Sequence, residues 1–175
     1  MSHVLTLRLV VIVSFTCFLF FSAGIQPVNT QQTELRTVVD YFLALPDRFT
    51  GETTREERNR LVSEDSGRLI TKDLKNGYLA IAGDAGSPGF VVAIFKKPDG
   101  KYLVGVNPYF EIGEDFFILS FENGKWINFT RMVIPGYDPK LHYVLPQYGT
   151  TIKVQNQAGK DLYELVWKGG QFVKK

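Results

Sequence analysis

The chain has 175 residues, with 20 lysines and arginines against 18 aspartates and glutamates, so its formal net charge is only +2. The basic residues form no long run, and the pairs Lys96-Lys97 and Lys174-Lys175 are typical of solvated strand ends. The sequence therefore predicts no clustered basic face for nucleic-acid phosphates. Its one cysteine, Cys17, excludes an intrachain disulfide and any site that needs several thiolates.

The first 24 residues have the pattern of a secretory signal peptide. Arg8 precedes an apolar run over residues 9–21, and residues 22–24 are the small residues that a signal peptidase accommodates. We expect cleavage before Ile25 and a secreted or periplasmic mature protein with no membrane span. The alternative is an uncleaved N-terminal membrane anchor, because the apolar run can be extended to roughly the 20 residues that a membrane-spanning helix needs.

Residues 25–32 are predicted to form a short polar tether, and residues 33–175 a single domain that is large enough to be held by its core alone. The domain is predicted to begin with a helix that has Thr33 as its N-cap and ends at Pro46, which has no amide hydrogen to donate. The apolar residues that fall on one face of this helix are Leu35, Val38, Val39, Phe42 and Leu45.

A second helix is predicted from Thr54 to about Ser63. Thr54 and Glu57 have the spacing of a capping box, in which each side chain accepts a hydrogen bond from the backbone amide of the other residue. Only Leu61 and Val62 supply an apolar face, so this helix is expected to be short and mostly exposed.

From Leu69 onward apolar residues recur with a period of two, and glycine-containing turns indicate hairpins between antiparallel strands. The expected strands are 78–82, 90–97, 102–107, 116–121, 126–131, 151–155, 162–168 and 172–174.

The segment Phe90–Phe95 is apolar on both faces, which is typical of a strand in the middle of a sheet that is covered on both sides. The first helix can cover one face, and curvature of the sheet or a second layer must close the other. We therefore predict an α+β domain in which N-terminal helices pack on a strongly bent, mostly antiparallel β-meander of about six to eight strands.

Residues 132–149 form a segment that is longer than ordinary hairpin connections, and long segments of this kind are usually functional or disordered. Its tyrosines argue against disorder, because each offers a flat apolar ring and a hydroxyl that suit a sugar or a peptide. The alternative is that these tyrosines fold back over the sheet as a lid on its core. The candidate ligand-binding residues here and in a second aromatic cluster are Tyr109, Phe110, Tyr137, His142, Tyr143 and Tyr148.

Residues suited to catalysis are sparse. His142 is the only histidine beyond the predicted signal peptide, which excludes a zinc site built on several histidines. Glu111, Glu114 and Asp115 can provide an acid and a base, but loop carboxylates that keep a sheet edge soluble are far commoner. No Gly-x-Ser-x-Gly elbow is present. The sequence predicts no catalytic residue, no metal site and no cofactor.

Three functions remain open at this stage. The first is an exported, non-catalytic binding module of the cell envelope or extracellular space that uses the aromatic segment 132–149 to hold a peptide, a glycan or a protein partner. The second is a structural or accessory envelope domain without a small ligand. The third is a small hydrolase that uses the loop carboxylates and His142.

Overall fold

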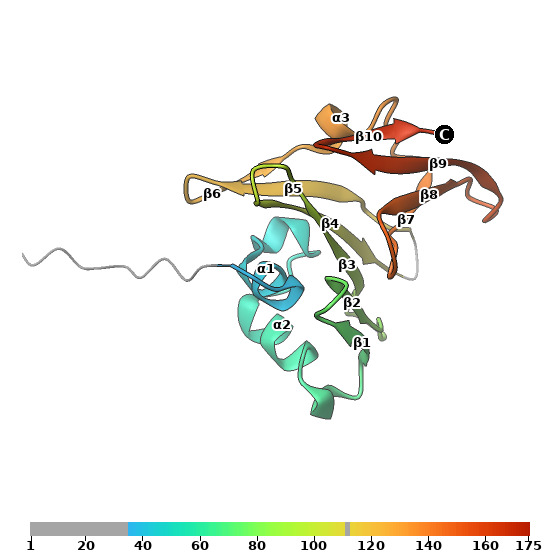
Figure 1. The fold of residues 1–175 in the computed structure, drawn as a ribbon. Helices are drawn as coiled ribbons and strands as arrows, with labels where there is room; N and C mark the ends of the chain where they lie inside the picture. The colour runs from blue at the N-terminus through green and yellow to red at the C-terminus, as the bar shows by residue number, and fades with distance from the viewer. Residues whose placement is uncertain (1–34, 111–112) are drawn as a thin grey trace, which may run out of the picture. The chain divides into compact units, whose positions relative to one another are not determined.

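The computed structural model describes residues 35–110 and 113–175, and these residues belong to one compact unit (Figure 1). The predicted signal peptide, the tether and the predicted N-cap Thr33 lie outside the described residues. None of the helices in the described part is long and apolar enough to cross a membrane.

Three layers make up this unit (Figure 1). A six-stranded antiparallel sheet lies in the middle, with α1 and α2 on one face and a four-stranded antiparallel sheet on the other. The middle sheet consists of β1 (Leu69–Asp73), β2 (Tyr78–Ile81), β3 (Gly89–Lys96), β4 (Tyr102–Tyr109), β5 (Phe117–Glu122) and β6 (Lys125–Asn128), in that order. The second sheet consists of β10 (Gln171–Lys174), β9 (Asp161–Lys168), β8 (Thr151–Gln155) and β7 (His142–Val144). The helices are α1 (Val38–Ala44), α2 (Arg55–Leu61) and α3 (Thr130–Val133), with 3-10 turns at Asp47–Phe49 and Glu64–Ser66.

The α+β class and the antiparallel pairing are confirmed, but the prediction of one bent meander is wrong because two separate sheets are present. The chain leaves the middle sheet at Asn128, whose Oδ1 accepts hydrogen bonds from the Thr130 amide at 2.9 Å and the Thr130 hydroxyl at 2.7 Å. This turn begins α3 where a strand was expected to continue to Arg131. The strands that follow α3 form the second sheet.

The eight expected strands are all present with small shifts of their ends, and the structure adds β1 and β7. The helix that was expected from Thr33 is observed as α1, with Thr37 as its N-cap. The Asp40 carboxylate accepts a hydrogen bond from the Thr37 amide at 2.8 Å and so closes a capping box. The predicted capping box of α2 is confirmed, since the Glu57 carboxylate accepts from the Thr54 amide at 2.8 Å.

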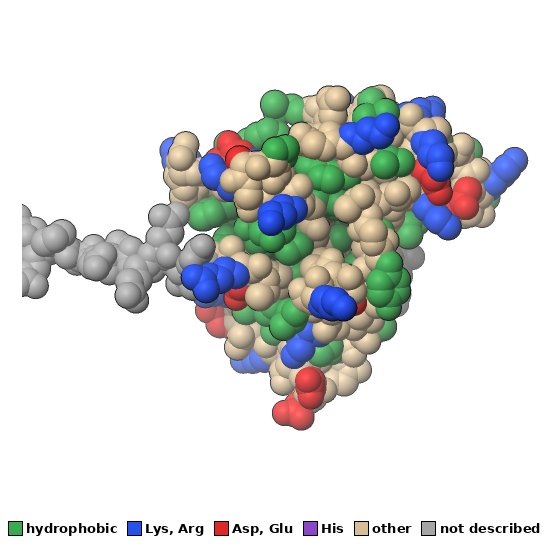
Figure 2. Space-filling view, in the orientation of Figure 1, with side chains coloured by type: hydrophobic (Ala, Val, Ile, Leu, Met, Phe, Trp, Pro, Cys, Tyr) green, Lys and Arg blue, Asp and Glu red, His purple; other side chains and the backbone are tan. Residues whose placement is uncertain are grey.

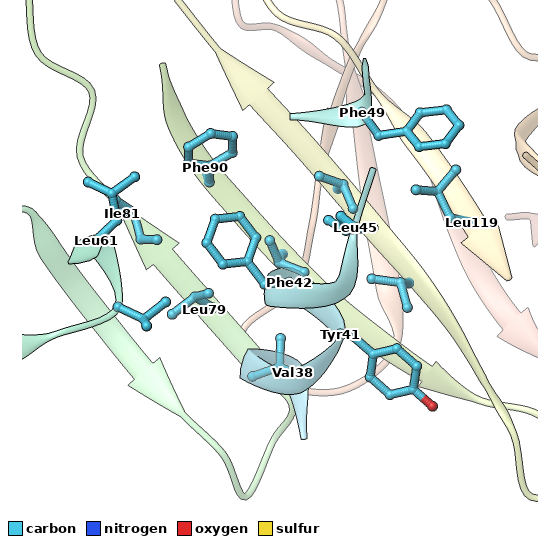
Figure 3. Close-up of a cluster of buried hydrophobic side chains, with 14 residues drawn as sticks. Val38, Tyr41, Phe42, Leu45, Phe49, Leu61, Leu79, Ile81, Phe90 and Leu119 are labelled. Atoms are coloured by element: carbon cyan, nitrogen blue, oxygen red, sulfur yellow. The ribbon is translucent and has the colours of Figure 1, made fainter. Parts of the chain in front are cut away.

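The helix-covered core fills the space between α1, α2 and the middle sheet (Figure 3). Val38 and Phe42 of α1 and the following residue, Leu45, point toward the sheet, and the Phe42 ring packs edge-on against that of Phe90 with centroids 5.1 Å apart. The one-sided apolar face predicted for this helix explains the packing.

The expectation that α2 is mostly exposed is confirmed, but its Arg58 is buried. Its guanidinium donates to the backbone oxygens of Leu45 and Thr53, and to a carboxylate oxygen of Asp47 at 2.9 Å. A fixed guanidinium fork can satisfy several acceptors at once, so Arg58 joins the end of α1 to α2. Nothing in the local sequence pattern marked this role.

The sheet-covered core lies between the two sheets. Ala93 and Phe95 of β3 belong to it, whereas Phe90 and Val92 of the same strand belong to the helix-covered core. The expectation that this strand is covered on both sides is therefore confirmed. On the face shown in Figure 2, the lysine and arginine side chains are spread among hydrophobic and uncharged surface.

Candidate functional site

A cavity of about 230 Å³ lies at one end of the sheet-covered core, between the middle sheet and β7 and β8. It brings together three of the six predicted ligand-binding residues, Tyr109, His142 and Tyr143, and one of the predicted carboxylates, Glu114. The residues that line it are Tyr78, Val91, Asn107, Tyr109, Glu114, His142, Tyr143, Val144, Leu145 and Gln155.

A chain of hydrogen bonds connects three side chains of this cavity. His142 Nδ1 lies 2.6 Å from Glu114 Oε1, and Glu114 Oε2 accepts a hydrogen bond from Asn107 Nδ2 at 3.1 Å. The side chains of His142 and Glu114 are 35% and 22% exposed. The carboxylate is therefore held on both of its oxygens while the imidazole remains accessible.

The backbone positions Glu114 for this contact. Glu114 forms an isolated antiparallel bridge with Tyr109 at the end of β4. The Phe110 amide donates to the Gly113 oxygen at 2.9 Å, and the Asp115 amide donates to the Pro108 oxygen at 3.0 Å. These bonds close the connection between β4 and β5 and direct Glu114 toward the second sheet.

The contact with Glu114 assigns the protons of His142. A carboxylate accepts hydrogen bonds, so Nδ1 of the imidazole carries the hydrogen that lies between the two groups. In the neutral imidazole Nε2 is then left as an acceptor. The arrangement can hold a donor group of a ligand or receive a proton from one.

Asn107 is only 7% exposed, and its Oδ1 has no hydrogen-bond partner among the residues that the structure describes. An unpaired buried acceptor costs about 1–3 kcal/mol relative to a paired one. Asn107 belongs to β4, at a position that faces the second sheet, where the neighbouring positions hold apolar side chains. A donor group that reaches Asn107 from the cavity recovers this loss.

Tyr109 and Tyr78 provide aromatic walls. The Tyr109 hydroxyl donates to the Ile81 oxygen at 2.8 Å, and its ring covers Gly89, where a Cβ would lie 2.1 Å from Tyr109 Cζ. Glycine is thus required at position 89 for this ring position. Burial, with a smaller contribution from Tyr109, raises the pKa of Tyr78, so its hydroxyl stays protonated in neutral solution.

Tyr143 is fully buried, as the lid alternative expects. Its ring stacks on that of Phe116 with centroids 4.6 Å apart, and its hydroxyl accepts from the Asp138 amide at 2.9 Å and donates to the Asp138 oxygen at 3.2 Å. Burial raises the pKa of Tyr143 to about 12. Tyr143 therefore forms part of the cavity wall but has no free surface of its own.

The other predicted ligand-binding residues do not line this cavity. Tyr137 is half-buried and stacks on Phe116 with centroids 6.4 Å apart. Tyr148 is exposed, and Phe110 is partly exposed above Gly51. The aromatic segment 132–149 therefore contributes to the site mainly through β7, and its tyrosines do not share one surface.

The other two predicted carboxylates are Glu111 and Asp115. Glu111 lies outside the described residues, and Asp115 is exposed and does not line the cavity. Within the described residues no three His, Cys, Asp or Glu side chains lie close enough together to hold a metal ion.

Two residues of the site, Tyr78 and Asn107, were not identified from the sequence. Asn107 carried a signal, because it is a polar residue in an expected strand whose other residues are mostly apolar. Tyr78 carried none, since an aromatic residue at the start of a strand is ordinary core material.

No known protein family matches the chain, and no curated protein or solved structure is similar enough to indicate a relationship.

Proposed function

We propose that the protein is an exported, non-catalytic binding module that holds a small polar ligand in the cavity between its two sheets. The observation that carries the proposal is the arrangement of Asn107, Glu114 and His142, in which one buried acceptor lacks a partner beside an oriented carboxylate–imidazole pair. Concave sites with a few convergent polar groups in an apolar surround are the usual form of ligand pockets.

The composition of the cavity wall favours binding over covalent catalysis. Serine, threonine and cysteine are absent from the residues that line it, so the His142–Glu114 pair has no serine, threonine or cysteine nucleophile there to activate. The wall instead combines apolar side chains with tyrosine rings, which suits ligand capture.

Export rests on the sequence pattern of the first 24 residues. We expect protein recovered from the medium or the periplasm to begin at or near Ile25, and N-terminal sequencing tests this. A full-length product that stays with membranes would instead support the N-terminal anchor.

The binding proposal is tested by filling the cavity. Val91 lines it and is half-buried, so Val91→Phe should occupy the ligand volume. We expect wild-type protein to bind at least one member of a panel of monosaccharides, amino acids and simple amines with 1:1 stoichiometry in equilibrium dialysis. Val91→Phe should abolish this binding.

Tyr148→Ala is the control, because Tyr148 is exposed and does not line the cavity. It should bind like wild type. Binding that survives in Val91→Phe would place the ligand elsewhere and contradict the proposal, as would a panel in which nothing binds to wild-type protein.

A second function is favoured by one distance, the 2.6 Å contact between His142 and Glu114. An imidazole oriented by a carboxylate is the usual general base for the attack of water on an ester. Release of nitrophenol from 4-nitrophenyl acetate, lost in both His142→Gln and Glu114→Gln and retained in Asp115→Asn, would favour this hydrolase over the binding module.

A further inference from the structure

The geometry points to a ligand that carries a primary ammonium group, bound in the cavity by Glu114, Asn107 and His142. This inference rests on the proposed binding function and names the class of ligand. It follows from the charge of the wall, the hydrogen-bonding capacity of its polar atoms, the ring surfaces and the size of the cavity.

The wall of the cavity favours a positive charge. Glu114 is its only acidic residue, and the residues that line it include no lysine or arginine. A carboxylate or phosphate ligand would therefore meet like charge without a lysine or arginine partner. A cation instead gains a favourable interaction that low surrounding polarity strengthens.

Two polar atoms of the wall can accept hydrogen bonds from a ligand. Asn107 Oδ1 has no partner among the described residues, and the contact with Glu114 leaves His142 Nε2 as an acceptor in the neutral ring. An ammonium group has three donors and no acceptor, so it complements both atoms. A ligand that presented acceptors to these atoms would leave them unpaired.

The aromatic side chains of the wall also favour a positively charged ligand. Tyr78 and Tyr109 both line the cavity, and the face of a tyrosine ring attracts a cation that lies within about 6 Å of its centroid. The hydrogen bond from the Tyr109 hydroxyl to Ile81 and the close contact with Gly89 fix the ring in place. The ring is therefore ordered before a ligand arrives.

The volume of the cavity limits the size of the ligand that it can enclose. At about 230 Å³, the cavity is smaller than the roughly 300–1,000 Å³ of pockets that hold drug-sized molecules. It suits a short aliphatic amine, or the amine-bearing end of a larger molecule that projects into solvent.

The experiment compares amines with uncharged molecules of nearly the same shape. Ethanolamine and putrescine are titrated into the wild-type mature chain at pH 8 by calorimetry, with ethylene glycol and 1,4-butanediol as their diol counterparts and glucose as a neutral sugar. We expect at least one amine to bind at least about tenfold more tightly than its diol, because charge-assisted hydrogen bonds are the stronger ones. This comparison needs no variant and so does not depend on how a variant folds.

Two variants that each remove one negative charge then test which carboxylate binds the amine. Glu114→Gln should weaken amine binding by about tenfold or more, whereas Asp115→Asn should leave it unchanged because Asp115 is exposed and outside the cavity. Equal losses in both variants would show a nonspecific charge effect and overturn the inference.

The possible outcomes distinguish a failure of the ammonium inference from a failure of the proposed binding function. Glucose or a diol that binds more tightly than the amines, in a manner lost in Val91→Phe, would overturn the ammonium ligand and leave the binding module standing. If none of these probes binds, the ammonium inference is rejected. The wider panel and Val91→Phe then decide on the binding module by themselves.

Discussion

The two faces of the middle sheet are formed by the same strands but are covered in different ways. The helix-covered face is filled by the large side chains of α1 and the strands, as the contact between Phe42 and Phe90 shows. The sheet-covered face is closed by only four strands, and one of their two edge strands, β7, has three residues. One end of this second core is therefore left open, and the cavity lies there.

The strand β4 contributes side chains to both faces of the middle sheet. Val104 and Val106 point into the helix-covered core, whereas Asn107 and Tyr109 line the cavity beside the second sheet. Because successive side chains of a strand alternate between faces, one strand can supply packing on one side and a polar site on the other.

The largest effect is expected from breaking the helix-covered face. Phe42 is fully buried, so Phe42→Ala should lower the free energy of unfolding by ~3–5 kcal/mol. Urea denaturation measures this. Ligand binding to the folded fraction should persist, because Phe42 does not line the cavity. A loss below about 0.5 kcal/mol, the range of surface substitutions, would show that α1 does not seal this face.

A smaller effect is expected on the sheet-covered face. Tyr143→Phe keeps the stacked ring but removes the hydroxyl that both accepts from and donates to the Asp138 backbone. We expect a loss of about 1–3 kcal/mol, because backbone groups of Asp138 are left without their partner. Tyr148→Phe is the matched control, since Tyr148 is exposed and should change stability by less than about 0.5 kcal/mol.

The smallest effect concerns the charge of the capping box at α2. Hydrogen bonds from the Thr54 amide and hydroxyl hold the pKa of Glu57 below its ordinary value in the folded protein. A carboxyl whose pKa is lowered by folding stabilises the protein above its unfolded-state pKa, and this contribution is lost as the pH falls through the folded-state pKa.

Glu57→Gln keeps a side chain that can accept the same bonds but does not titrate. The stability difference between wild type and Glu57→Gln should therefore shrink as the pH is lowered through the acid range. Thermal unfolding at a series of pH values checks this. A difference that is constant with pH, or that grows toward acid, would show that the charge of Glu57 has no role in the cap.

The parts of the fold that were predicted correctly depend on residues close together in sequence. The capping box of Thr54 and Glu57, the end of α1 before Pro46 and the alternation within each long strand are all local patterns. The division into two sheets was not predictable in this way. It depends on α3, a helix of four residues, which is too short for a helical period to be visible.

The site was predictable in part for the same reason. The sequence named His142 and Glu114 as candidate partners, yet 28 positions separate them and only the second sheet brings them into contact. β7, which carries His142, has three residues and is too short for an alternating pattern to be recognised. The unpaired acceptor of Asn107 is a property of packing and has no local signature.

The order of the strands has a consequence for how the protein folds. In both sheets each described strand pairs only with strands next to it along the chain. Pairing between neighbours requires only short loops to close, and chains rich in such local contacts fold faster than chains with distant pairings. We expect each sheet to complete its own ladder early and the two sheets to dock afterwards. The contact between His142 and Glu114, which joins them, would then be among the last native interactions to form.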